Sequence, residues 1–216
     1  MSRRAPWFFL IAIAAALAIA GVYLPLPWLH YFAKPLTTLL IVAMVWCQPS
    51  AESGYREGIL AGLLLSTLGD VFLMLPGDYF VLGLSSFLLA HLAYLFAFAR
   101  RERLFVIVWP ALVYAAVAAA ALSFLWTKLP PALTVPVLVY AAVLASMAAQ
   151  AAVVWLRRRD RPTALAAVGG LFFVASDSLL GTETFLTRFA AAPLLVLTTY
   201  WIAQTLIGAS VARDDR

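Results

Sequence analysis

Two aspartates, Asp70 and Asp177, stand inside long apolar segments of the sequence. A carboxylate deep in a membrane-spanning helix costs at least about 2.5–3.5 kcal/mol on insertion scales, so it normally faces the protein interior and has a function. Two such acids in a medium of low dielectric constant do not both ionise, which leaves a protonated acid beside an ionised base. The pair therefore suits general acid–base hydrolysis, and it equally suits a proton relay in a transporter.

A line of small residues leads to the first of these aspartates. Gly58, Gly62 and Ser66 precede Asp70 at intervals of four residues, so all four lie on nearly the same side of a helix. Small side chains in such a line let a second helix approach closely. The pattern directs Asp70 toward the protein interior, although a purely structural reading, in which the line only packs two helices, stays open.

Further polar residues recur at helical spacing within the apolar segments. A histidine and a tyrosine share one face, and a tyrosine and a glutamine share another, three or four residues apart. Such side chains either orient a carboxyl group or a water molecule, or they only join helices through hydrogen bonds. The candidates for the first role are Ser66, His91, Tyr94, Ser176, Tyr200 and Gln204.

The sequence contains no motif for a metal, a cofactor or a serine nucleophile. Gly-x-Ser-x-Gly, His-Glu-x-x-His and phosphate-binding glycine loops are all missing. His91 has only His30 as a second histidine, without the spacing of metal ligands. The single cysteine, Cys47, excludes an intramolecular disulfide. We expect neither a metal nor a cofactor.

The composition is that of a helical membrane protein. Of the 216 residues 65% are hydrophobic and 12% are charged, with a mean hydropathy of +0.97, whereas soluble domains carry about 25% charged residues. The apolar runs are long and unbroken, which favours helices over a barrel. We expect an all-α integral membrane protein, a single polytopic domain over residues 1–216, with eight spans at roughly 7–24, 35–48, 57–75, 79–99, 104–126, 132–156, 163–182 and 191–210.

The basic residues predict the orientation of these helices. With the N-terminus in the cytoplasm, the outer segments hold only Lys34, Lys128 and Arg188. The inner segments then hold the other 12 of 15: Arg3, Arg4, Arg56, Arg100, Arg101, Arg103, Arg157, Arg158, Arg159, Arg161, Arg213 and Arg216. This positive-inside pattern places both termini in the cytoplasm. Because the net charge of +5 comes from these short clusters, we do not expect nucleic-acid binding.

Two features of the spans allow further interpretation. The two aspartates lie in the third and seventh predicted helices, four helices apart, near the outer ends of their segments, which favours a possible parallel 4+4 internal repeat. Their similar depth would let them face one cavity. The first segment, with Arg3-Arg4 before it and Ala18-Ile19-Ala20 within it, imitates a cleaved signal peptide. Apolar character continues past Gly21, which favours a retained helix.

At these residues the sequence resembles the YhhN-like family of membrane lysoplasmalogenases. The matching pieces are spread in order over most of the chain. They are Lys34-Pro35-Leu36-Thr37-Thr38, Gly62-Leu63-Leu64-Leu65-Ser66-Thr67-Leu68-Gly69-Asp70, Phe80-x-x-Gly83-Leu84-x-x-Phe87-x-x-x-His91-x-x-Tyr94, Ser176-Asp177 and Tyr200-x-x-x-Gln204.

The resemblance implies a hydrolase in the cell (cytoplasmic or inner) membrane that cleaves the vinyl-ether bond of lysoplasmalogens. Its paired aspartates map onto Asp70 and Asp177, which would act on a lysophospholipid from the bilayer with water as the second reactant. The products would be a fatty aldehyde and glycerophospho-ethanolamine or -choline. Lys34, in a matching motif, is the preferred contact for the lipid phosphate. A proton-relay transporter and a non-catalytic membrane binding or assembly protein stay open as alternatives, as do the headgroup, the oligomeric state and which aspartate is the acid.

Overall fold

The computed structural model describes residues 5–49 and 52–212, and within these ranges it is entirely helical. Eight of its helices are long and apolar enough to cross a membrane, the fifth together with the short 3₁₀ turn η1 (Trp126–Lys128). They are α1 (Ala5–Tyr23), α2 (Pro27–Trp46), α3 (Ser53–Met74), α4 (Phe80–Arg101), α5 (Trp109–Leu125), α6 (Pro131–Arg158), α7 (Arg161–Phe185) and α8 (Ala192–Ala209). The predicted all-α class with eight spans is confirmed, and the chain is a multi-pass membrane protein.

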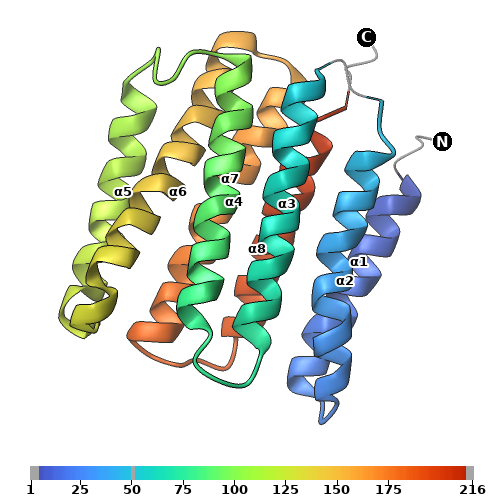
Figure 1. Ribbon diagram of the computed structural model, residues 1–216, viewed down its shortest axis with the longest axis vertical. Coiled ribbons are helices and arrows are strands. Elements are labelled where there is room, and N and C mark those ends of the chain that lie inside the picture. The colour runs from blue at the N-terminus through green and yellow to red at the C-terminus, as the bar shows by residue number, and fades with distance from the viewer. Residues whose placement is uncertain (1–4, 50–51, 213–216) are drawn as a thin grey trace.

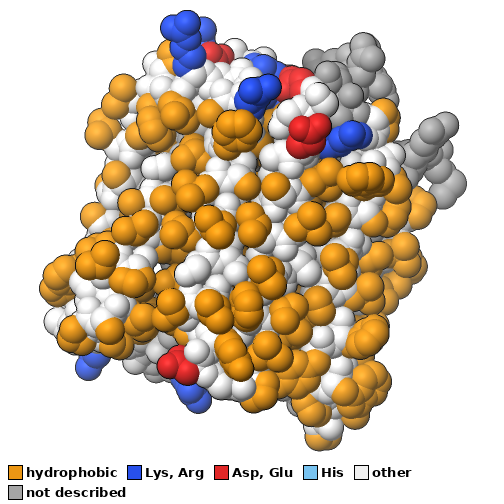
Figure 2. Space-filling model, in the orientation of Figure 1, with side chains coloured by type: hydrophobic (Ala, Val, Ile, Leu, Met, Phe, Trp, Pro, Cys, Tyr) orange, Lys and Arg blue, Asp and Glu red, His pale blue; other side chains and the backbone are white. Residues whose placement is uncertain are grey.

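The helices stand side by side along one common direction. In Figure 1, α1 and α2 lie at one side of the molecule and α5 and α6 at the other, with α3, α4, α7 and α8 between them. Charged side chains gather at the two ends of the helices, and hydrophobic side chains cover the length between (Figure 2). This is the surface that a bilayer requires of a spanning protein.

The orientation in the membrane and the internal repeat remain predictions. Arg3, Arg4, Arg213 and Arg216, which contribute to the predicted cytoplasmic charge, lie outside the described residues. The described part of the chain places the start of α1 and the end of α8 at one end of the bundle (Figure 1). An even number of spans requires this arrangement.

Helix α2 differs from its predicted span. It begins at Pro27 rather than near residue 35, and Pro35 lies inside it. Proline has no N–H to donate and normally interrupts a helix, but neighbouring helices in a membrane protein compensate for the lost bond. As a result, Lys34 lies on a helix with 8% of its surface exposed, rather than in an outer loop.

The line of small residues on α3 packs against α4, as its spacing predicts. A Cβ atom at Gly58 would lie 2.8 Å from the Cβ of Ala97, and one at Gly62 would overlap the ring of Tyr94. Both glycines are buried. Their missing side chains let α3 and α4 meet closely, so that Tyr94 projects beneath α3 into the core.

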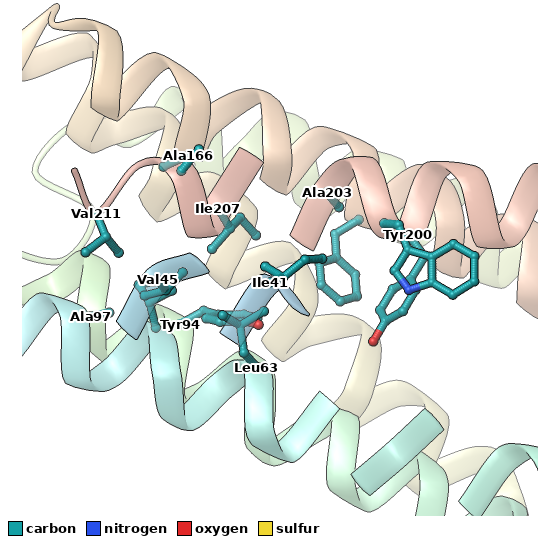
Figure 3. Close-up of a cluster of buried hydrophobic side chains, with 14 of the residues drawn as sticks. Ile41, Val45, Leu63, Tyr94, Ala97, Ala166, Tyr200, Ala203, Ile207 and Val211 are labelled. Atoms are coloured by element: carbon teal, nitrogen blue, oxygen red, sulfur yellow. The ribbon is translucent and has the colours of Figure 1, made fainter. Parts of the chain in front are cut away.

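The core lies where α2, α3, α4, α7 and α8 meet. Figure 3 shows side chains from all five helices in one cluster, and Tyr94 lies among them with its ring fully buried. The Tyr94 hydroxyl donates a hydrogen bond of 2.6 Å to Oε1 of Gln204 on α8. The labelled members of the cluster are Ile41, Val45, Leu63, Tyr94, Ala97, Ala166, Tyr200, Ala203, Ile207 and Val211.

A charged network joins helices at the other end from the two aspartates. Glu52 accepts hydrogen bonds of 2.9 Å from Arg101 and from Arg158. Arg101 also lies over the ring of Tyr55, with its guanidinium carbon 3.3 Å from the ring centroid. Partial burial acts to raise the pKa of Glu52, but the hydrogen bonds from Arg158 and Arg101 outweigh it and hold that pKa below its ordinary value. The network ties the start of α3 to the ends of α4 and α6.

We predict that Gly62→Ala lowers the stability of the protein by about 1–3 kcal/mol, as overpacking of a core does. The added methyl group overlaps the buried Tyr94 ring, which its bond to Gln204 holds in place. Thermal unfolding of the purified protein in detergent measures the effect. Gly181→Ala is the matched control, because a Cβ there meets only Leu125, at 3.3 Å. Equal loss of stability in the two variants would contradict the prediction.

Candidate active site

Asp70 is a buried carboxylate surrounded by donors from two other helices. It lies on α3, and only 2% of its surface is exposed. The hydroxyl groups of Tyr200 on α8 and Thr38 on α2 donate hydrogen bonds to its Oδ2, of 2.7 Å and 3.0 Å. The ammonium group of Lys34 on α2 lies 3.5 Å from Oδ1. Asp70 therefore has both a counter-charge and hydrogen bonds.

Asp177 has a different environment. It lies on α7, is partly buried, and accepts one hydrogen bond, of 2.6 Å, from the hydroxyl of Tyr140 on α6. Within the described residues no lysine, arginine or histidine lies within ion-pair distance of it. The two aspartates thus differ in their surroundings: Asp70 is paired with a cation, whereas Asp177 has only a hydroxyl partner among the described residues.

Both aspartates line one cavity with polar walls, which we call the polar cavity. It encloses about 310 Å³, at the lower end of the range of small-molecule sites. Its wall is formed at the ends of α1, α3 and α7 and at the starts of α2 and α8. The polar members of the wall are His30, Lys34, Asp70, Ser176, Asp177, Glu183 and Tyr200.

A second cavity, the apolar chamber, meets the polar cavity at Asp177. It encloses about 110 Å³ and lies mainly between α4, α5, α6 and α7, with Leu73 of α3 in its wall. The two share only four wall residues, namely Leu73, Phe87, Asp177 and Leu180. Asp177, with Tyr140 beside it, therefore lies between the polar cavity and the apolar chamber.

The structure divides the other predicted site residues into two groups. Tyr200 and Ser176 reach the polar cavity, where the Ser176 hydroxyl donates to the carbonyl of Val196 at 3.1 Å. The second group lies deeper and lines neither cavity: Ser66, His91, Tyr94 and Gln204.

His91 belongs to the deeper group and is completely buried. Its ring packs edge-on against Phe173, with centroids 4.6 Å apart, and against Tyr140, with centroids 5.2 Å apart. Neither ring nitrogen has a hydrogen-bond partner among the described residues, and the same holds for Oγ of Ser66 and Nε2 of Gln204. His91 therefore packs against the ring of Tyr140, whose hydroxyl donates to Asp177.

Two residues that donate hydrogen bonds to the aspartates were not among the predicted site residues. Thr38 follows Lys34 by one helical turn, and this spacing alone would have placed both on one face of α2. Tyr140 is a polar residue in the middle of an apolar span, which was the available signal. Of the other outer cations, Lys128 and Arg188 are exposed and line neither cavity.

The residues around the site show no arrangement suited to a metal. Across residues 5–49 and 52–212, no group of three or more His, Cys, Asp or Glu side chains is placed to hold an ion. Asp70 is instead held by two hydroxyl groups and an ammonium group, and Asp177 by one hydroxyl group.

Comparison with known proteins gives matches over nearly the whole chain. The model of the YhhN family matches residues 29–211. The human protein named lysoplasmalogenase TMEM86B is 32% identical over 191 residues, which cover 88% of this chain and 78% of the relative. The Escherichia coli O157:H7 protein named uncharacterized membrane protein YhhN is 30% identical over 204 residues, covering 93% and 96%. No solved structure matches the chain.

We predict that Lys34→Met destabilises the protein by about 3 kcal/mol, because breaking a buried ion pair leaves Asp70 without its counter-charge. In an Asp70→Asn background the same substitution should have a much smaller effect, because no buried charge remains to be paired. Thermal unfolding of the four proteins in detergent completes the cycle. Lys128→Met, at an exposed lysine, serves as the control. Equal losses in both backgrounds would show that Lys34 does not stabilise Asp70.

Proposed function

Since the chain belongs to the YhhN family, in which matched relatives are named lysoplasmalogenase, we propose that it is a hydrolase that cleaves the vinyl-ether bond of lysoplasmalogens. The reaction yields a fatty aldehyde and a glycerophospho-ethanolamine or -choline. The observation that carries this proposal is the pair of aspartates in one cavity, one with a cation and one without.

Asp177 is the proton donor in this proposal. An ionised carboxylate without a cation is strongly disfavoured where water is scarce, and among the described residues the only hydrogen-bond partner of Asp177 is Tyr140. Asp177 therefore carries its proton at rest. It also borders the apolar chamber, where an alkenyl group would lie. A carboxylic acid at this position matches the first chemical need of the reaction, which is protonation of a carbon–carbon double bond.

Asp70 is the base. Lys34 supplies its counter-charge, and the hydroxyl groups of Tyr200 and Thr38 donate to the same oxygen, Oδ2. Hydrogen bonds and a nearby cation both favour the ionised form of a carboxyl group. The negative charge of Asp70 also stabilises a positively charged intermediate in the same cavity.

The reaction then proceeds in three balanced steps. Asp177 gives its proton to the β-carbon of the vinyl ether, and the electrons of the double bond form the new C–H bond, which leaves an oxocarbenium ion at the α-carbon. Water attacks that carbon while Asp70 takes up the proton of the water, which forms a hemiacetal. The hemiacetal hydroxyl then gives up its proton and its oxygen forms the carbonyl of the aldehyde, while the bond between the α-carbon and the ether oxygen breaks and the glycerol oxygen takes up that proton and leaves as an alcohol. One water molecule is consumed. Transfer of the proton from Asp70 to Asp177 then returns both carboxyl groups to their starting states.

Lys34 has a second role in the proposal, as the contact for the lipid phosphate. Its ammonium group carries three donors and reaches Asp70 through two contacts, to Oδ1 at 3.5 Å and to the backbone carbonyl at 3.4 Å. It also lines the polar cavity. A phosphate in that cavity would therefore find a cation with donor capacity left.

The remaining site residues support these groups. Tyr200 orients Asp70, and Ser176 presents a polar wall to the headgroup. His91 packs against Tyr140 and fixes the ring that binds Asp177. Tyr94 and Gln204 join α4 to α8, and Ser66 lies on the same buried face of α3 as Asp70. The members of this set that line neither cavity support the catalytic pair without contacting the substrate, and they are His91, Tyr94, Gln204 and Ser66.

We predict that Asp70→Asn and Asp177→Asn each reduce aldehyde release from 1-alkenyl lysophospholipid by about 10²–10⁴-fold, the usual contribution of general acid–base groups. Mass spectrometry of the products in nanodiscs measures the rate. Asp78→Asn, at an exposed loop residue, is the matched control and should retain full activity. Wild-type protein that releases no aldehyde across a panel of headgroups, yet moves protons or solutes into liposomes, would favour the transporter instead.

The proposed first step predicts where solvent hydrogen appears. In deuterium oxide, the released aldehyde should carry one deuterium on the carbon next to the carbonyl, because Asp177 exchanges with solvent and protonates that carbon. Immediate trapping of the aldehyde, followed by mass spectrometry, locates the label. The saturated aldehyde incubated alone with the protein controls for later exchange. An unlabelled carbon would exclude protonation of the double bond as the mechanism.

A further inference from the structure

The apolar chamber has the lining of a binding site for hydrocarbon. Its walls come from α4, α5, α6 and α7, and most of its wall residues are aliphatic or aromatic. The hydroxyl of Ser178 in this wall already donates to the carbonyl of Val174, at 2.7 Å. Among the described residues that line the chamber, Asp177 is the only carboxylic acid and there is no Lys, Arg or His; Asp177 also lines the polar cavity.

Small side chains on three helices make the space of the chamber. Ala118 and Ala121 contribute from α5, Ala141 and Ala145 from α6, and Gly181 from α7. A Cβ atom added at Gly181 would meet only Leu125, at 3.3 Å, so the side of α7 that faces the chamber is open. Larger residues at these positions would take up space in the chamber.

The chamber lies next to the lipid-facing surface of the bundle. Among the described helices, α5 packs mainly on α6, contacts α7 less, and makes little contact with α4. Chamber residues on α4 and α5, such as Leu84 and Val117, therefore face each other across the chamber rather than in a packed helix pair. Leu112 and Val113 on the other side of α5 are exposed. The chamber therefore lies where α4 and α5 do not form a packed helix pair.

We propose that the apolar chamber binds the hydrocarbon chain of a single-chain amphiphilic lipid, with its polar part in the polar cavity and the first bond of its chain beside Asp177. The proposal rests on the proposed function and adds the place and direction of the chain. One chamber joins one polar cavity, which matches a lipid with one chain. The residues that face the chamber from α5 and α7, above all Ala121 and Gly181, then limit the length or width of the chain.

The test is photolabelling in nanodiscs with a saturated 1-alkyl lysophospholipid that carries a diazirine at the end of its chain. This ether has no double bond to protonate, so labelling does not depend on turnover. We expect the label on chamber residues of α5, α6 and α7, and we expect unlabelled alkyl lysophospholipid to compete with it. Peptide mass spectrometry locates the label.

Variants distinguish the chamber from the outer surface of the same helix. Ala121→Phe and Gly181→Leu place a side chain where the hydrocarbon lies, so they should reduce specific labelling by about tenfold or more, as overpacking of comparable size does. Ala119→Phe is the matched control on α5, because Ala119 is exposed and lines neither cavity. It should leave labelling unchanged, and thermal unfolding checks that all three variants are folded.

The outcomes separate this proposal from the proposed function. Label confined to the lipid-facing residues of α5, equal in all variants, would overturn the chamber as the chain site even if the wild type released aldehyde. Specific labelling of the chamber in a protein that releases no aldehyde would support the chain site and overturn the proposed chemistry. A shorter optimal substrate chain in Ala121→Phe than in Ala119→Phe would support both.

Discussion

The free-energy cost of removing the carboxylate of Asp70 from water is the constraint on which the arrangement of the core depends. An ionised carboxylate at membrane depth is tolerated only with a counter-charge and hydrogen bonds to its oxygens. No single helix can supply both, so α2 brings Lys34 and Thr38 and α8 brings Tyr200 to the carboxylate on α3. Trp201 extends the arrangement by donating to the hydroxyl of Thr38, at 3.4 Å. The contact of α2 and α8 with α3 is therefore fixed by charge as well as by packing.

The rest of the core supports this arrangement by bringing α4 close to α3. Two glycines on α3 admit the side chains of α4, and Tyr94 crosses beneath them to reach Gln204 on α8. The rings of Phe87 and Phe173 then pack edge-on against Tyr200, with centroids 5.8 Å and 5.7 Å away. Edge-on packing of this kind fixes ring orientation, so the hydroxyl that binds Asp70 has little freedom. Packing in the core and geometry at the carboxylate are two parts of one structure.

The sequence predicts the membrane class, the eight spans and the importance of the two aspartates, because each depends on a local signal. Long apolar runs reveal the helices, and a carboxylate inside such a run stands out by its cost. The start of α2 was missed because Pro35 is a strong local stop signal, whereas the surrounding helices let the helix pass through it. That error also placed Lys34 outside the bundle, so its pairing with Asp70 was not foreseen. Tyr140 was missed as the partner of Asp177 because the contact depends on how α6 and α7 are rotated against each other, which spacing within one helix does not determine.

The junction of two unlike cavities at a single carboxyl group has a consequence for what happens after bond cleavage. Cleavage of a lysoplasmalogen gives two products of different solubility. The aldehyde prefers hydrocarbon, and the phosphoglycerol product prefers water. Cleavage beside Asp177 would leave the first in the apolar chamber, next to the bilayer, and the second in the polar cavity, next to the aqueous mouth. Each product would depart by its own route into a different phase. Dilution into two phases would then keep the two products apart, and neither would need to pass the catalytic pair again.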